Sequence, residues 1–222
     1  MGENIYKCAN ICTKLTRLFK NIGLTEFQST IQGIHFIPQL FLVLFVSDLF
    51  QYSAHYFFHK IPFLWRFHAI HHSTKHLDWL AGSRTHFVDL VVVRSISFIP
   101  LYAFGFSSDV FITYVIIVSI QAVLAHANTR INFGFLKYIF VTPQYHHWHH
   151  SDNPEAFDKN FSIHFPFIDM MFGTYFDRGN EWTERTGLGE KVVVPKGYLK
   201  QFLIPFYKNP QDDSGITNKS ER

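Results

Sequence analysis

The chain has 222 residues, enough for one domain with a sizeable buried interior. Its formal net charge is only +3, from 20 Lys and Arg against 17 Asp and Glu, which argues against a nucleic-acid-binding protein. Aromatic residues make up 18% of the chain and charged residues only 17%, so we expect part of its surface to face lipid.

Residues 1–33 form a mixed, moderately basic N-terminal segment to which the sequence assigns no role. They suggest an amphipathic surface helix with a break near Gly23, and they lack the apolar core and cleavage site of a signal peptide. Cys8 and Cys12 are the only two cysteines. A disulfide or a metal pair is conceivable for them, but we expect two unrelated thiols, because no further cysteine completes a sulfur site.

The first long apolar run covers residues 34–59 and is long enough to cross the roughly 30 Å hydrocarbon layer of a membrane. Polar residues at steps of three, four and four place Asp48, Gln51, His55 and His59 on one helical face. An acid inside a span usually faces the protein interior. We therefore expect Asp48 to orient a ligand histidine, with an interhelical or interfacial contact as the alternative.

Residues 60–84 are too polar to span and predict an interfacial helix with Trp65 at headgroup level. Two further apolar runs, residues 87–105 and 110–127, flank a polar turn and predict a helical hairpin across the bilayer. The hairpin should kink at Pro100. Arg94, within the first of these runs, is expected to pair with Asp89 or with the interface.

The predicted hairpin starts and ends on one side of the membrane. It therefore returns His86, at its entry, and His126, at its exit, to the side that holds His55 and His59. Three spans would place the basic N-terminal segment on the opposite side, against the positive-inside rule. Either residues 31–44 turn back within the membrane, or an upstream span is missing from the chain.

The C-terminal third continues with a short interfacial segment at residues 128–141 and a histidine cluster at 146–150. Residues 161–176 are rich in aromatics but are interrupted by Pro166 and Gly173, so they do not predict a span with any clarity. Residues 177–222 are polar, and 212–222 are expected to be a disordered tail.

Histidines occur in three groups with helical spacing: one HxxxH and two HxxHH patterns. Together with His126 they exceed what one tetrahedral ion uses, so two ions in an all-histidine shell account for their number. Imidazole suits iron, copper, zinc and nickel, and a redox pair of irons could activate O2 against an unactivated C–H bond. The predicted ligands are His55, His59, His68, His71, His72, His126, His146, His149 and His150, with His86 and His164 as further candidates. His147 is expected to be a neighbour of the site.

These patterns and their flanking residues resemble the fatty acid hydroxylase/sterol desaturase superfamily of integral-membrane di-iron enzymes. The flanking residues that match include Asp48, Trp65 to His68, Arg84 to His86, Thr142 and Pro143, and Asp158 to Phe161. The resemblance covers roughly residues 40–176. It departs at Tyr56 and His147, where the family often carries a basic residue.

The resemblance implies an all-α membrane protein with few transmembrane helices and a cytosolic-side helical cap that holds a histidine-rich dimetal site. Residues 34–176 would form the catalytic domain, with Asp48 and Asp158 orienting ligands. It implies two iron ions, O2 as co-substrate, and electrons from a donor such as cytochrome b5 or ferredoxin with its reductase. The membrane would be the endoplasmic reticulum in a eukaryote and the inner membrane in a bacterium.

The activity expected is hydroxylation, or alternatively desaturation, of a lipid, fatty-acyl or sterol-type substrate. Two other classes remain open: a membrane metal transporter or sensor, and a membrane zinc hydrolase. A transporter should carry ionisable residues near the middle of the membrane, whereas these histidines gather at span ends and in interfacial segments. A zinc hydrolase would need neither O2 nor a reductant.

Overall fold

The computed structural model describes residue 20 and residues 23–189 and 194–207. The expectations for Cys8, Cys12 and the tail at 212–222 lie outside these residues. Within them the structure is helical, and the one extended pairing is an isolated antiparallel bridge between Ser151 and Thr186. The predicted all-α class is confirmed.

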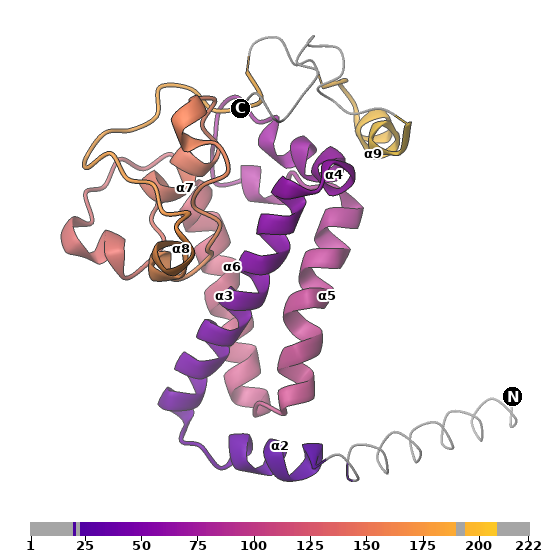
Figure 1. Cartoon of the computed structure of the whole chain (residues 1–222), viewed down its shortest axis with the longest axis vertical. Helices are drawn as coiled ribbons and strands as arrows, with labels where there is room; N and C mark the ends of the chain where they lie inside the picture. The colour runs from indigo at the N-terminus through magenta and orange to yellow at the C-terminus, as the bar shows by residue number, and fades with distance from the viewer. Residues whose placement is uncertain (1–19, 21–22, 190–193, 208–222) are drawn as a thin grey trace, which may run out of the picture.

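Three helices are long and apolar enough to cross a membrane: α3 (Phe36–Lys60), α5 (Phe87–Phe104) and α6 (Ser108–His126). They run along the long axis of the molecule, and α3 packs against both of the others (Figure 1). α5 continues as a helix through Pro100. The predicted first span and hairpin are therefore present, and the chain is an integral membrane protein.

The hairpin turn needs a glycine and is held by a glutamine. Gly105 ends α5 with φ +78°, a left-handed conformation that favours residues without a Cβ. The buried amide of Gln39, near the start of α3, accepts hydrogen bonds from the backbone N–H and the hydroxyl of Ser107 at 2.8 and 2.7 Å. One side chain thus fixes the hairpin against the first span.

A short helix, α2 (Leu24–Gln32), lies across the end of the bundle that carries the hairpin turn (Figure 1). It begins after Gly23, where the sequence suggested a break, and Gln28 donates to the carbonyl of Ala103 at 2.8 Å. α3 then runs unbroken from Phe36. Residues 36–60 are therefore one continuous helix, and the chain changes direction before it, between Gln32 and Phe36.

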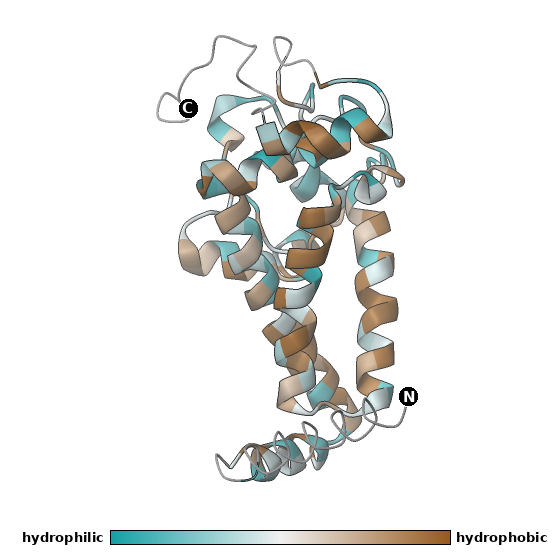
Figure 2. Ribbon diagram, turned by 90° about the vertical axis from the view of Figure 1, so that its right-hand side faces the viewer, coloured by the Kyte–Doolittle hydropathy of each residue, from teal (hydrophilic) through white to brown (hydrophobic). Residues whose placement is uncertain are grey.

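The opposite end of the bundle carries a cap of shorter elements. These are α4 (Pro62–His72), η1 (Ala81–Ser83), η2 (Gly134–Tyr138), α7 (Pro143–His149), η3 (Pro154–Ala156), α8 (Pro166–Phe172) and α9 (Tyr198–Tyr207). Hydrophilic residues are more frequent in this cap than along the three spans (Figure 2). The interfacial helix expected after the first span is α4.

Two apolar clusters hold the spans and the cap together. Val43, Leu101, Val110 and Tyr114 are fully buried between the three long helices. A second cluster joins α3 to the segment before and within α8, and it consists of Tyr52, Phe161, Phe165 and Ile168. Large apolar side chains on the outer faces of α5 and α6, such as Ile99 and Ile120, are exposed as lipid contact requires. The second cluster brings the 161–168 segment against the histidine-bearing half of α3.

Candidate metal centre

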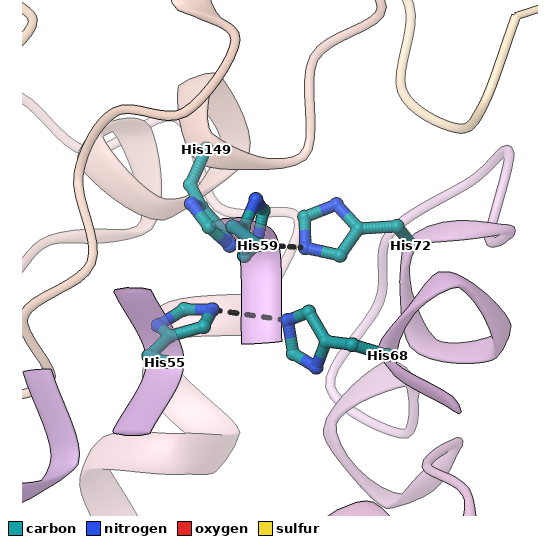
Figure 3. A group of neighbouring side chains, drawn as sticks. All are labelled: His55, His59, His68, His72 and His149. Carbon is teal, nitrogen blue, oxygen red and sulfur yellow. Dashed lines mark hydrogen bonds between the residues drawn. The ribbon is translucent and has the colours of Figure 1, made fainter. Parts of the chain in front are cut away.

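Five histidines from three helices form the first histidine group. Their potential ligand nitrogens lie within 4.8 Å of one another, and all five side chains are buried. α3 supplies two, α4 two and α7 one, and their rings converge on a common centre (Figure 3). The members are His55, His59, His68, His72 and His149.

Four further histidines form the second histidine group beside the first: His71, His126, His146 and His150. They are also buried, with ligand nitrogens within 4.8 Å of one another. The two groups touch, because the ring centres of His72 and His150 are 4.3 Å apart. The structure thus divides the nine predicted ligands between two adjacent groups.

The HxxHH spacing explains why each cluster serves both groups. On α4, His68 and His72 are one turn apart and face the first group, while His71 points to the second. α7 reverses this division, with His146 and His150 in the second group and His149 in the first. Two short helices therefore bridge the two centres.

Hydrogen bonds to backbone carbonyls fix the orientation of several rings. Nδ1 of His55 lies 2.8 Å from the carbonyl oxygen of Phe161, and Nδ1 of His149 lies 2.8 Å from that of Lys159. In the second group, Nδ1 of His126 lies 2.7 Å from the carbonyl oxygen of Ala122. A carbonyl only accepts, so each Nδ1 donates and each Nε2 of a neutral ring presents a lone pair.

Pairs of these Nε2 atoms face each other at short range. The Nε2 atoms of His55 and His68 are 3.0 Å apart, and those of His126 and His71 are 3.3 Å apart. Nδ1 of His68 is held by a carboxylate and Nδ1 of His71 by the carbonyl of Arg84, so lone pairs oppose one another in both contacts. Two nitrogens bound at about 2.1 Å to one metal ion have a comparable separation. The donor sets therefore fit metal ions.

The buried environment keeps these imidazoles neutral. Burial, reinforced by the neighbouring histidines, lowers the pKa values of His71, His72, His146 and His150 well below the usual value. The pKa of His149 is lowered in the same way, and its Nε2 is buried with no hydrogen-bond partner among the described residues. Neutral imidazole is the form that binds metals.

Of the two carboxylates predicted to orient ligands, Asp158 contacts a histidine. Its Oδ1 lies 3.2 Å from Nδ1 of His59, and its Oδ2 accepts from Nζ of Lys60 at 2.8 Å. A carboxylate behind a ligand histidine fixes the ring and increases its basicity.

Asp48 makes different contacts from those expected. Its fully buried carboxylate accepts backbone N–H bonds from Ile163, His164 and Phe165 at 2.7 to 3.0 Å. These bonds anchor the chain just after the carbonyl of Phe161 that holds His55. Asp48 therefore acts on the ligand through the backbone, because its position on α3 faces the 163–165 segment.

The sequence interpretation missed Asp89. Its Oδ2 lies 2.7 Å from Nδ1 of His68 and also accepts from the Thr85 hydroxyl at 3.1 Å. Of the two expectations for Arg94, pairing with Asp89 or with the interface, the first is not found, since the described salt bridges pair Asp89 with His68. The available signal was an acid in the first turn of an apolar span, one turn after His86.

The remaining histidine candidates lie outside both groups. His86 caps α5, with Nδ1 accepting from the N–H of Val88 at 3.0 Å, and its Nε2 contacts the carbonyl of Phe202 in α9 at 2.9 Å. His164 is buried beside the ring of Tyr114. His147 packs against Trp182.

A cavity of about 140 Å³ opens beside the two groups. His55, His68, His71, His126 and His146 form part of its wall. Residues of α5 and α6 form much of the rest, including Leu90, Val93, Arg94, Val118 and Ala122. Both histidine groups thus border a space that the two hairpin helices extend into the membrane-spanning region.

The part of the chain that carries both histidine groups matches a known protein family. The family model described as fatty acid hydroxylase matches residues 40–174, which include every histidine of both groups. The chain belongs to the fatty acid hydroxylase family.

Curated relatives of the chain carry the names of lipid-modifying enzymes. Ornithine lipid hydroxylase OlsE of Rhizobium tropici is 33% identical over 168 residues, covering 76% of this chain and 50% of that protein. Alkylglycerol monooxygenase of Caenorhabditis elegans is 29% identical over 132 residues, covering 60% of this chain and 26% of that protein. The Danio rerio alkylglycerol monooxygenase is 30% identical over 128 residues, covering 58% of this chain and 28% of that protein. The chain thus spans half or less of each of these relatives, and no solved structure matches it.

Proposed function

We propose that this fatty acid hydroxylase family member is an O2-dependent di-iron oxygenase that hydroxylates a lipid at the membrane. The observation that carries the proposal is the pair of adjacent, buried, all-histidine groups in the wall of a largely apolar cavity. The names of the curated relatives, a lipid hydroxylase and two alkylglycerol monooxygenases, support a lipid substrate.

The first histidine group would hold one iron and the second group the other. When bound, the iron pair supplies the redox chemistry that lets O2 attack an unactivated C–H bond. One oxygen atom enters the C–H bond and the other leaves as water, with two electrons and two protons from outside the chain. The electrons would come from a donor such as cytochrome b5 or ferredoxin with its reductase.

The protein's own residues position the ligands and the substrate. Asp89 and Asp158 hold the rings of His68 and His59 through Nδ1, which leaves Nε2 of each ring directed at the centre. The apolar wall formed by Leu90, Val93 and Val118 would exclude water and hold an alkyl chain beside the histidines.

A smaller opening on the other side of the first group supports access from the aqueous phase. It is lined by His59, Trp65, His72, His149 and Asp158, among others. We place the cap on the cytosolic side of the endoplasmic reticulum membrane in a eukaryote, or of the inner membrane in a bacterium. A cytosolic electron donor would then reach this opening without crossing the bilayer.

The test is lipid analysis of cells that express the full chain together with a competent reductase system under 18O2. We expect a new lipid that carries one 18O atom, and about two irons in each purified chain. His149→Ala should abolish the product and reduce bound iron. His147→Gln is the matched control, because His147 is on the same helix but outside both groups.

Three results would overturn the proposal. One is a lipid profile identical to that of the host despite bound iron and an active reductase. Another is a product that forms without O2, and the third is purified protein that binds zinc alone. A product that carries a new double bond and no 18O would indicate desaturation by the same centre.

A further inference from the structure

Arg94 is a cation in the wall of the cavity and within a membrane span. It lies on α5 and is partly buried, eight positions into a helix of 18 residues. Among the described residues, no salt bridge includes Arg94, and Asp89 is engaged with His68 and Thr85. A charged side chain inside a span is costly, so it is usually directed into a polar cavity or toward a charged ligand.

The Arg94 side chain lines the cavity. Its guanidinium carbon lies 5.8 Å from the ring centre of Phe98, one turn further along α5. The guanidinium is therefore available to a ligand that enters the cavity.

A second polar group lies on the facing side of the same cavity. Gln51 also lines it, one turn before His55 on α3, and its amide nitrogen donates to the hydroxyl of Tyr114 at 3.2 Å. Because α3 and α5 are antiparallel beside the histidines, Gln51 and Arg94 both lie on the bilayer side of the metal centre. Leu90, Val93 and Val118 form apolar walls around these two polar groups.

We propose that Arg94 binds the acidic group, carboxylate or phosphate, of the lipid substrate, and so selects acidic amphiphiles over neutral ones. Arg94 lies five residues beyond Asp89, a helical rise of about 7.5 Å, and Asp89 contacts His68 of the first group. Given the proposed function, the carbon that is oxidised lies within the first few carbon atoms from the acidic group. Guanidinium forms two parallel hydrogen bonds with either anion, which makes it the suitable cation for this role.

The binding half of the proposal can be tested without turnover. The full chain in dodecyl maltoside at pH 7.5 is titrated with tritiated palmitate and with tritiated hexadecanol. Phosphatidic acid and diacylglycerol then serve as competitors that separate a phosphate headgroup from a carboxylate. We expect one or both acidic probes to bind about tenfold or more tightly than their neutral counterparts.

Substitutions assign the effect to the cavity. Arg94→Gln should remove the preference for acids, Arg94→Lys should retain most of it, and Arg130→Gln, in the cap, should leave it unchanged. Size-exclusion profiles and iron content show whether each variant folds. Equal binding of both acidic probes and their neutral counterparts by the wild type, or an undiminished preference in Arg94→Gln, would overturn the proposal.

The same experiment separates this inference from the proposed function. His149→Ala should retain the preference for acids even where it has lost iron, because Arg94 lies outside both histidine groups. A preference for acids that survives without any oxygenated product would contradict the proposed function alone. An oxygenated product from a chain that binds acids and alcohols equally would contradict the inference alone.

Discussion

Single side chains behind the histidines decide how well the centre is organised. Nδ1 of each oriented ring contacts either a backbone carbonyl, as in His55 and His149, or a carboxylate, as in His68 and His59. A backbone partner cannot be removed by substitution, whereas a carboxylate can. The carboxylates are therefore the residues at which positioning of the ligands can be tested.

Asp89→Asn should weaken metal binding while the fold persists. The amide retains shape but loses the charge that holds His68, and loss of such a partner typically costs about 10- to 100-fold in metal affinity. Iron retained against increasing chelator concentration measures this effect. Thr85→Val is the control, because it removes the other hydrogen bond to the same Asp89 oxygen and leaves the contact with His68. Equal iron retention by Asp89→Asn and wild type would contradict the assigned role.

His164 should make the stability of the protein depend on pH. Burial lowers the pKa of His164 from 6.5 to about 4. Between these values the unfolded chain binds the proton and the folded chain does not, so stability is full above pH 6.5 and falls as the pH drops toward 4. From pH 7.5 to 5.5 the loss attributable to His164 is about 1 kcal/mol.

Thermal unfolding of the purified chain and of His164→Gln at both pH values checks the direction of this pH dependence. Other histidines titrate in both proteins, so the difference between the two losses isolates His164. We expect the variant to lose less stability on acidification. An equal loss in both proteins would show that His164 is accessible to protons in the folded state.

At the scale of helices, the apolar runs predict the three spans because length and hydropathy are local properties. The HxxHH spacing similarly indicates one histidine-bearing face on α4 and on α7. It does not indicate that each helix serves two centres, since that division depends on how α4 and α7 cross α3 and α6. Asp89 was missed for the same reason, because its partner His68 lies in another helix.

The contacts of Asp48 show where helical periodicity fails to identify a partner. Periodicity correctly places Asp48 on the polar face of α3 with His55 and His59, all of which are buried. Its three partners are backbone amides more than a hundred residues away, which no side-chain pattern records. The face of the helix was predictable, but the segment that packs against it was not.

The hairpin helices should determine which substrates enter the cavity. Ala122 on α6 lines the cavity, and its carbonyl accepts from Nδ1 of His126. Ala122→Phe keeps this carbonyl but introduces a ring into the cavity, so product yield should fall at least about tenfold while iron content stays unchanged. Val123→Phe is the matched control, because Val123 is exposed on the outer face of the same helix. Lipid analysis with iron determination checks both variants, and normal turnover by Ala122→Phe would exclude this cavity as the substrate site.

At the scale of the whole molecule, the three spans separate two ends that carry different elements and residues. One end carries α2 and the hairpin turn, and the other carries the cap with every histidine of both groups (Figure 1). The cap contains Lys75, Arg84 and Lys159, whereas the hairpin turn at residues 105–107 contains no basic residue. By the positive-inside rule this distribution favours a cytosolic cap. The basic residues of the N-terminal segment favour the opposite orientation.

Labelling of single cysteines can decide this orientation. In a chain with Cys8→Ser and Cys12→Ser, we expect Asp152→Cys in the cap to react with a membrane-impermeant maleimide in spheroplasts only after the membrane is opened. In sealed microsomes, whose cytosolic face is outside, it should react directly. Thr25→Cys, on α2, should react in sealed spheroplasts or in microsomes opened on the lumenal side, because an odd number of spans separates the two positions. Val123→Cys, facing lipid, controls for reagent that partitions into the membrane. Labelling of both positions from one side would mean that one of the three helices does not cross the bilayer. If Asp152→Cys instead reacted from the non-cytosolic side and Thr25→Cys from the cytosolic side, the histidines would lie on the side away from the cytosol. A cytosolic electron donor could not reach them there.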